Sequence, residues 1–248
     1  MKIKSWVYFS LVLLSLGISS CEEKAVSSEQ IKKKKSVSTP KSKFKEVEIG
    51  KQIWMLENLN VSKFRNGDII PEAQTVDEWK KASENKQPAW CYYNNDSSRG
   101  EKYGRLYNWY TVNDPRGLAP NGWHIPSIEE WELMFKYIDP SSKGIESTDS
   151  DVGKKMKSTT DWDCWPYSPV EEGYSCNGNN QSGFSGLPGG CRTAISSFNG
   201  LNYIGTWWSS TEHKTTNAWT VGLICALEIV SIEKSEKSLG FSVRCIKD

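Results

Sequence analysis

The stretch GLAPNGWHIPSIEEWELMFKYI, residues 117–138, places a histidine close to two glutamates. His124, Glu129 and Glu130 belong to the residue types that perform general acid–base chemistry when they converge on a substrate. The only other histidine of the chain, His213, has no second ligand near it in the sequence at the spacing of a metal site. The first question is therefore whether the cluster around His124 reacts or builds structure.

The same residues fit the start of a helix. Ser127 and Glu130 have the S-x-x-E spacing of a capping box, in which each side chain accepts a hydrogen bond from the other residue's amide. Apolar residues then recur at helical spacing and predict one buried face. They are Ile128, Trp131, Phe135 and Ile138. His124 lies in an extended lead-in with no Ser, Cys or Asp partner nearby in the sequence. We therefore predict a structural role for the cluster and no catalytic residue in it.

The seven cysteines are the other residues with reactive potential. Six of them follow Cys21, and an even number in an exported chain favours disulfides over free thiols. These candidates are Cys91, Cys164, Cys176, Cys191, Cys225 and Cys245. Cys164 and Cys176 enclose a short loop and are the preferred pair, whose closure stabilises by about 3 kcal/mol in the chain-entropy account. No CxxC or Cys/His spacing indicates a metal site, and we expect no cofactor.

The N-terminus predicts export and lipidation. Residues 1–20 have a basic start followed by an apolar run that is shorter than the roughly 20 residues of a membrane-spanning helix, as in a signal peptide. The run ends at SLGISSC, which resembles a bacterial lipobox with Cys21 as the acylated residue. Ordinary secretion, with cleavage near Cys21, is the alternative. An acylated Cys21 predicts attachment to the membrane through lipid.

Residues 21–43 then predict a disordered tether. They are rich in Lys, Ser and Glu and include the basic run 32–35, so they have little to bury. The basic run is interpreted as a solvated arm, and no nucleic-acid partner is expected for an exported protein. Residues 44–248 remain as one folded domain.

The domain is expected to be α+β. Eleven of the twelve tryptophans lie in it. Residues 44–60 predict a hairpin that turns at Gly50–Lys51, residues 75–85 a capped helix, and residues 103–112 a buried helix. Long loops are expected over 143–180, followed by strands over 206–211, 217–230 and 240–248. Helices early and strands late indicate an antiparallel sheet.

Several motifs in a fixed order resemble the Fibrobacter succinogenes major paralogous domain of exported proteins and lipoproteins. The motifs are IWMLENLN, WCYYNNDSSRGEKYGRLYNWYTVNDPRGLAPNGWHIPSIEEWELM, GFSGLPGG, GTWWSSTE and GFSVRCIKD. The pattern is also distantly similar to the C-type-lectin-like fold of formylglycine-generating sulfatase-modifying factors. These resemblances imply a C-type-lectin-like domain, with short helices packed on a twisted antiparallel sheet and with long loops.

The resemblance also bears on the cysteines. Relatives usually have an aromatic residue where this chain has Cys191, and Cys225 also looks like an addition to the family pattern. A comparison with the family therefore implies a Cys191–Cys225 disulfide in addition to Cys164–Cys176. Cys91 and Cys245 lie in family motifs and either pair with each other or stay buried thiols.

Three functions compete. The first is a lipid-anchored binding module of the cell envelope, at the outer membrane, whose ligand is a glycan or an envelope protein. Its candidate contacts are Trp90, Tyr92, Tyr93, Trp165 and Tyr167. The second is an oxidising enzyme of the formylglycine-generating type, which is disfavoured because Cys191 and Cys225 lie in no matching motif. The third is a calcium-dependent lectin, for which the loop segments NND (94–96), VNDP (112–115) and ESTDSD (146–151) offer oxygen ligands. It is disfavoured because these segments lack the lectin signature. A binding module rather than an enzyme is therefore expected.

Overall fold

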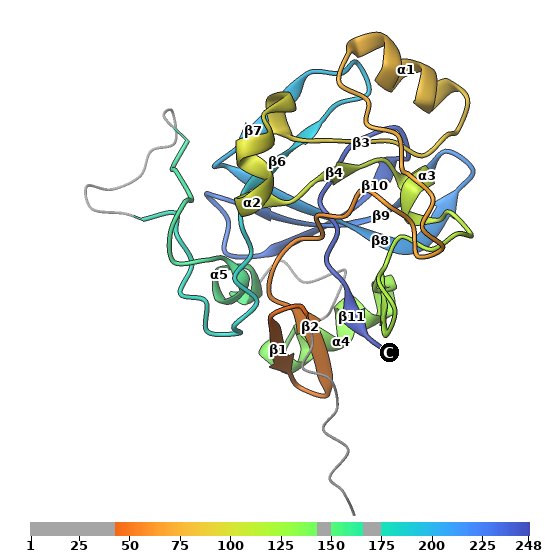
Figure 1. Cartoon of the computed structure of the whole chain (residues 1–248). Coiled ribbons are helices and arrows are strands. Elements are labelled where there is room, and N and C mark those ends of the chain that lie inside the picture. Colours follow the sequence, from red (N-terminus) through yellow and green to blue (C-terminus); the bar gives the residue numbers. More distant parts are fainter. Residues whose placement is uncertain (1–42, 143–149, 166–174) are drawn as a thin grey trace, which may run out of the picture. The chain divides into compact units, whose positions relative to one another are not determined.

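The computed structural model describes residues 43–142, 150–165 and 175–248 (Figure 1). Ser42–Asp248 forms one compact unit, in which short helices accompany mostly β structure, so the fold is α+β as expected. The predicted signal peptide, Cys21 and all of the tether except Lys43 lie outside the described residues. Among the residues described, no helix is both long enough and apolar enough to cross a membrane.

A four-stranded sheet contains the predicted hairpin. β1 (Glu46–Ile49) and β2 (Gln52–Met55) pair antiparallel with Val47 opposite Trp54. β11 (Ile246–Lys247) lies between β2 and β5 (Trp123–His124), so the C-terminal residues close this sheet. The turn requires glycine, because Gly50 has φ +67° and a Cβ there would lie 2.9 Å from Cγ of Tyr137.

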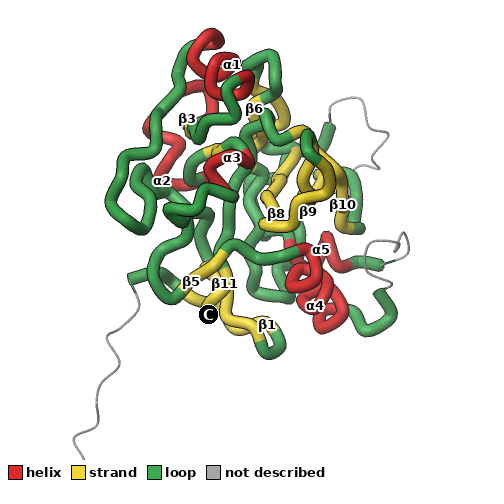
Figure 2. Tube along the Cα trace, turned by 90° about the vertical axis from the view of Figure 1, so that its right-hand side faces the viewer, coloured by secondary structure: helices red, strands yellow, loops and turns green. Residues whose placement is uncertain are grey.

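A five-stranded sheet forms the larger layer and follows the order β10-β9-β8-β6-β7. Figure 2 shows β8, β9 and β10 side by side. Its strands are β6 (Gly189–Arg192), β7 (Phe198–Leu201), β8 (Ile204–Lys214), β9 (Asn217–Ile224) and β10 (Val230–Glu236). The pairings are antiparallel except that β6 meets β8 in parallel at Gly190 and Gly205. The sheet is therefore mixed rather than purely antiparallel. The single strand predicted over 217–230 is two, because the chain turns after Ile224.

The capping box predicted at Ser127 is confirmed, and the helix predicted over 75–85 is capped as well. α1 (Val76–Glu84) begins after Thr75, whose side chain forms a complete capping box with Glu78. α4 (Ile128–Ile138) begins after Ser127, which forms the same box with Glu130. The remaining helices and helical turns are short. They are η2 (Tyr93–Asn95), η3 (Ser97–Arg99), α2 (Gly100–Tyr103), α3 (Trp109–Val112) and α5 (Val152–Met156).

The helix predicted over 103–112 is wrong in its first half. Leu106 and Tyr107 form β4, which pairs antiparallel with β3 (Trp90–Cys91), and only α3 is helical. The reason is local. Gly104 has φ +73° and ends α2, whereas Asn108 caps α3 by accepting from the amide of Thr111 at 3.1 Å. The apolar residues have helical spacing here because two adjacent short elements, β4 and α3, both contribute side chains to the core.

The C-terminal segment connects the sheets. Only Ile246–Lys247 of the strand predicted over 240–248 is a regular strand. The residues before it form isolated bridges instead, with a different partner at each position. The bridges join Gly240 to Arg192, Phe241 to Tyr107 and Ser242 to Trp207. Because neighbouring residues bond to different elements, this segment holds the fold together without being a long strand.

The core is built from aromatic side chains. Trp54 lies with its ring centroid 4.6 Å from that of Trp131, and Phe184 lies edge-on to both Trp54 and Trp207. Trp208 belongs to a second cluster and lies 4.9 Å from Phe241. Trp54, Trp131 and Trp208 are all fully buried, which confirms the burial predicted for Trp131. A few large rings supply the buried area that a chain with short helices and strands otherwise lacks.

A buried arginine and asparagine lie between these clusters. Arg244 is fully buried and donates from Nη2 and Nε to Oδ1 of Asn58, at 2.8 and 3.2 Å. The same oxygen accepts from the indole of Trp207 at 2.8 Å, and Nδ2 of Asn58 donates to the carbonyl of Tyr103 at 2.9 Å. The guanidinium also bonds the carbonyl of Phe184 and lies 4.1 Å from the centroid of that ring. We call Asn58, Tyr103, Phe184, Trp207 and Arg244 the arginine hub.

Replacing Asn58 by alanine should therefore destabilise the domain strongly. Asn58→Ala leaves the guanidinium of Arg244 buried without its amide acceptor, which costs about 3–5 kcal/mol of the free energy of unfolding. Asn66→Ala is the matched control, since Asn66 is exposed and bonds locally to Asp68. It should cost less than about 0.5 kcal/mol. Urea unfolding measures both changes, and equal losses in the two variants would contradict the role of the hub.

Candidate functional site

Of the five aromatic contact candidates, Trp165 is the one that the structure places at the surface. Its side chain is 41 % exposed. Trp90 and Tyr93 are core residues, 5 % and 9 % exposed, and Tyr92 is half-buried. Ligand contact through Trp90 or Tyr93 is therefore a wrong expectation. Tyr167 lies outside the described residues.

Trp90 and Tyr92 both lie against an arginine. The guanidinium of Arg105 lies 4.0 Å from the ring centroid of Trp90 and 4.9 Å from that of Tyr92. The indole of Trp90 donates to the carbonyl of Ile70 at 2.9 Å. Gly100 leaves no room for a side chain, since a Cβ there would lie 2.1 Å from the Tyr92 ring. These contacts show that Trp90, Tyr92 and Arg105 pack against one another as part of the fold.

Trp165 lies flat on another aromatic ring. Tyr203 stacks against it with the ring centroids 5.7 Å apart and the planes inclined by 11°. Beside this pair, the amide of Asp163 donates to the carbonyl of Asn202 at 2.8 Å, and Nδ2 of Asn202 donates back to the Asp163 carboxylate at 3.0 Å. We call Asp163, Trp165, Asn202 and Tyr203 the Trp165 surface. Aromatic faces next to carboxylate and amide groups suit both sugar rings and peptides.

Sequence reasoning missed Asn202 and Tyr203. They lie almost 40 positions after Trp165 and belong to the turn between β7 and β8, where Asn202 has φ +66°. Asparagine adopts this left-handed conformation more readily than most residues. The pair Asn202–Tyr203 between two strands was therefore the available sequence signal for a turn. That signal predicts a turn but not its partner.

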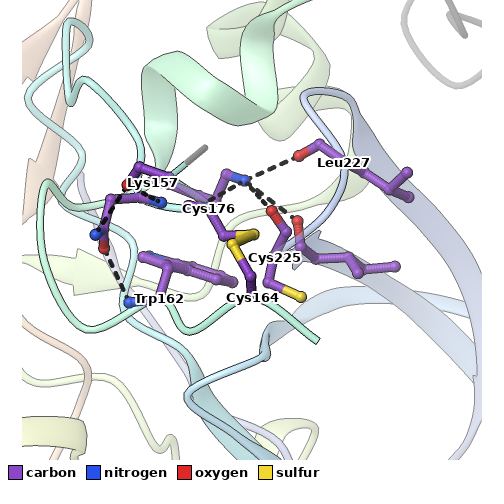
Figure 3. Close-up of a disulfide and its surroundings, with 9 residues drawn as sticks. Lys157, Trp162, Cys164, Cys176, Cys225 and Leu227 are labelled. Carbon is purple, nitrogen blue, oxygen red and sulfur yellow. Dashed lines mark hydrogen bonds between the residues drawn. A yellow bond between two sulfur atoms is a disulfide. The ribbon is translucent and has the colours of Figure 1, made fainter. Parts of the chain in front are cut away.

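The predicted disulfide holds the base of the Trp165 surface. Cys164 and Cys176 are bonded with their Cα atoms 5.3 Å apart (Figure 3). The neighbouring Trp162 is buried, and its indole donates to Ser158 Oγ and to the carbonyl of Gly186, both at 3.1 Å. Trp162 and Cys164 are thus both held in place. Because Trp165 comes directly after Cys164, its backbone is positioned by these contacts.

A buried lysine joins this disulfide to the end of β9. Nζ of Lys157 bonds to the carbonyls of Cys225 and Leu227 at 2.9 Å each and to that of Cys176 at 3.2 Å (Figure 3). It also lies 3.3 Å from the carbonyl of Ile224. Burial lowers the pKa of Lys157 to about 8. No sequence pattern indicates this contact, because the acceptors are backbone carbonyls, which every residue type has.

The other expected disulfide, Cys191–Cys225, is wrong: both residues are free thiols. Cys191 is in β6 and Cys225 follows β9, with β8 between them. Two strand spacings separate the residues by about 10 Å, which exceeds the Cα separation that a disulfide bridges. Of the two alternatives for Cys91 and Cys245, the structure has the buried thiols. Burial raises the pKa of each, to about 11 for Cys91.

His124 has two acidic partners. Nε2 lies 2.8 Å from Oε1 of Glu130, and Nδ1 lies 2.8 Å from Oδ1 of Asp248. The other oxygen of Glu130 accepts from the amide of Ser127 at 2.8 Å. The sequence predicted no nearby Ser, Cys or Asp partner for His124, but Glu130 lies six positions further on and Asp248, 124 positions away, reaches the ring through β11. Both ring nitrogens contact carboxylates, so the cluster connects the C-terminal residue to α4.

The loop acids named for calcium are engaged by neighbours. Oδ1 of Asp96 accepts from the amide and hydroxyl of Ser98 at 3.0 and 2.6 Å. Asp114 binds Arg116 through both carboxylate oxygens, at 2.8 and 2.9 Å. Within residues 43–142, 150–165 and 175–248, no group of three or more His, Cys, Asp or Glu side chains is arranged to hold a metal. Residues 146–149 of the ESTDSD segment lie outside the described parts.

The stabilisation by His124 should depend on pH. Burial lowers the pKa of His124, but the hydrogen bonds and charges of Glu130 and Asp248 outweigh it and raise the pKa above the ordinary value. A raised folded-state pKa means that the stabilisation is fully present below the unfolded value of about 6.5 and is lost as the pH rises through the folded value. Because the side chain is 38 % exposed, the effect is at most about 1 kcal/mol.

Urea unfolding of the native chain and of His124→Gln at about pH 6 and about pH 9 measures this dependence. The variant should be the less stable at the lower pH, and the difference should shrink at the higher pH. His213→Gln is the control. Burial, Lys234 and Lys214 lower the pKa of His213, so its substitution should show no such loss on raising the pH. A difference for His124→Gln that grows with pH would contradict the ion-pair assignment.

The family comparison accounts for the motifs of the chain. The model of the Fibrobacter succinogenes major domain matches residues 47–247. Comparison with curated proteins and comparison with solved structures find no significant match. The C-type-lectin-like resemblance therefore stays a prediction. Because the match spans most of the sequence and nearly all of the compact unit, the chain belongs to the Fibrobacter succinogenes major domain family.

Proposed function

We propose that this protein is a lipid-anchored binding module of the cell envelope, which contacts a glycan or an envelope protein through the Trp165 surface. The observation that carries the proposal is the exposure of Trp165, stacked on Tyr203 and fixed next to the Cys164–Cys176 disulfide. A rigid aromatic side chain loses little conformational entropy on binding and buries a large area. Asp163 and Asn202 supply polar groups beside it.

The anchoring part of the proposal rests on the sequence. An acylated Cys21 followed by a tether of about 22 residues gives the domain a mean reach of roughly 25 Å from the bilayer. That distance suits contact with other envelope components at the outer membrane, on its periplasmic or its surface face.

A binding role is also supported by what the reactive side chains do. Both nitrogens of His124 face carboxylates, and the pKa values of Cys91, Cys191 and Cys245 are raised by burial. A thiol with a raised pKa is a poor nucleophile near neutral pH. Disulfide bonding does not remove the thiols of Cys191 and Cys225, contrary to expectation. Their positions two strands apart argue against a reactive pair of the formylglycine-generating type.

Binding through Trp165 is tested on a glycan and envelope-protein array probed with the full chain. Trp165→Ala should weaken any specific interaction at least about tenfold, as expected when a central aromatic contact is truncated. Tyr137→Ala is the matched control, because it removes another exposed aromatic side chain, from α4. A ligand that binds both variants equally well would exclude the Trp165 surface as its site.

Lipid anchoring is tested in the native host by membrane fractionation and by mass spectrometry of the mature N-terminus. The native chain should partition with membranes and carry acyl chains on Cys21, whereas Cys21→Ser should be soluble, because one signal-peptide-sized apolar segment does not anchor a cleaved chain. An unmodified Cys21 in the mature protein would contradict the anchor.

A further inference from the structure

One face of the five-stranded sheet contains a cavity of about 190 Å³ that the Trp165 surface does not use. Three adjacent strands, β8, β9 and β10, form its floor and walls, with β6 and Phe241 at its side. The lining side chains with hydroxyl groups are Thr206, Thr220, Ser231 and Ser235. We call this cavity the sheet trough. Its volume equals that of about six water molecules, so it suits one small ligand rather than a polymer segment.

The floor of the sheet trough is a glycine that the fold does not require. Gly222 lies in the middle of β9, opposite Thr206 of β8 and Ser231 of β10. Its φ is not in the left-handed region. A Cβ there would meet its nearest neighbour, Cβ of Ser231, at 3.5 Å, an ordinary contact. Glycine within a strand is unfavourable and often marks a place where a ligand approaches the backbone. Gly222 therefore leaves the backbone at the floor of the trough open to an occupant.

The polar groups around Gly222 leave one hydroxyl unused. Thr220 and Ser235 hydrogen-bond to each other at 2.9 Å, and Ser231 donates to the Glu233 carboxylate at 2.8 Å. The hydroxyl of Thr206 has no hydrogen-bond partner among the described residues, although Thr206 is half-buried. This hydroxyl is not one of the fully buried polar atoms without a partner, so it is accessible. This hydroxyl and the second oxygen of Glu233 are thus available to a ligand.

The chemistry of the lining limits what the occupant is. Glu233 is the one charged residue that lines the cavity within the described parts of the chain, so an anion would be repelled. Ile204, Ile224 and the bare backbone of Gly222 present an apolar surface between the hydroxyl groups. A pyranose ring has the matching form, with C–H groups on its faces and hydroxyls around its rim.

We propose that the sheet trough binds one neutral sugar unit, with the ring over Gly222 and with hydroxyl groups bonded to Thr206 and Glu233. This site is separate from the Trp165 surface. Neither Trp165 nor Tyr203, on which it stacks, lines the trough. Tyr203 packs against the core cluster that contains Val221 and Leu223, and the trough residues Thr220 and Gly222 alternate with these two along β9. The chain therefore has two independent contact sites.

Cys191 provides a reporter for the sheet trough. It lines the cavity and is half-buried, whereas Cys91, Cys225 and Cys245 are buried. The purified full chain is alkylated with iodoacetamide, and the rate at Cys191 is followed by peptide mass spectrometry. Glucose, mannose and N-acetylglucosamine are the neutral probes, and glucuronate is the anionic one. At least one neutral sugar should slow alkylation of Cys191 in a saturable manner, whereas glucuronate should not.

Two variants test the assignment of residues. Gly222→Val should fill the sheet trough and remove the protection, while the fold stays at least as stable, because a β-branched residue suits a strand better than glycine. Thr206→Val removes the unpartnered hydroxyl in an isosteric way and should weaken sugar binding about three- to tenfold without lowering stability. Glu236→Val is the control, since Glu236 is exposed and points away from the cavity on the same strand as Glu233.

The outcomes separate the two sites. Trp165→Ala should leave sugar protection of Cys191 unchanged, so a failure of the proposed Trp165 contact does not affect this test. Equal protection in Gly222→Val, Thr206→Val and the native chain would overturn the proposal, as would a lack of protection by every neutral sugar. Protection by glucuronate equal to that by glucose would overturn the neutral specificity.

Discussion

The fold depends on a positive charge that is buried without a carboxylate. Arg244 contacts the amide oxygen of Asn58, the carbonyl of Phe184 and the faces of two aromatic rings. A buried charge is stable only when its donors are satisfied, so each of these neutral groups must be in place at once. Because they come from the loop after β2, from the segment before β6, from β8 and from the C-terminal segment, the hub fixes the mutual placement of elements far apart in sequence.

Two other cations are held in a similar way. Arg192 is 1 % exposed, donates to the carbonyl of Thr75 at 2.9 Å and lies 4.5 Å from the ring centroid of Trp79. Lys157 donates to carbonyls next to the disulfide. Both side chains donate hydrogen bonds to backbone carbonyls of segments that lie far from them in the sequence. In a domain with few long helices, buried cations thus take over part of the role that regular backbone hydrogen bonds have elsewhere.

Local sequence patterns predicted local structure well. The capping box at Ser127, the turn at Gly50 and the disulfide of a short loop all depend on residues close together in the sequence. Long-range contacts were beyond such patterns. Asp248 reaches His124 across 124 positions, and β6 meets β8 in parallel. Exposure was also unpredictable, since Trp90 and Trp165 are the same residue type, and only tertiary packing buries the first.

The sites considered for function lie outside this core. The groups with reactive potential in the described residues mostly take part in packing, while the Trp165 surface and the sheet trough have exposed or unpartnered groups. The rigidity of the core matters for both sites, because a preformed surface loses less entropy on binding. The disulfide and Lys157 hold the backbone near Trp165 in place, and the paired strands β8, β9 and β10 hold the lining of the trough in place.

The central claim is that the arginine hub opens only when the whole domain unfolds. Hydrogen exchange of the Trp207 indole N–H, which donates to Asn58, tests this directly by NMR. The opening free energy measured from the Trp207 indole proton should equal that of the slowest amides of β8 and β9. Both should equal the free energy of unfolding in urea. Exchange of this proton through a local opening of much lower free energy, while the strand amides stay protected, would contradict the claim.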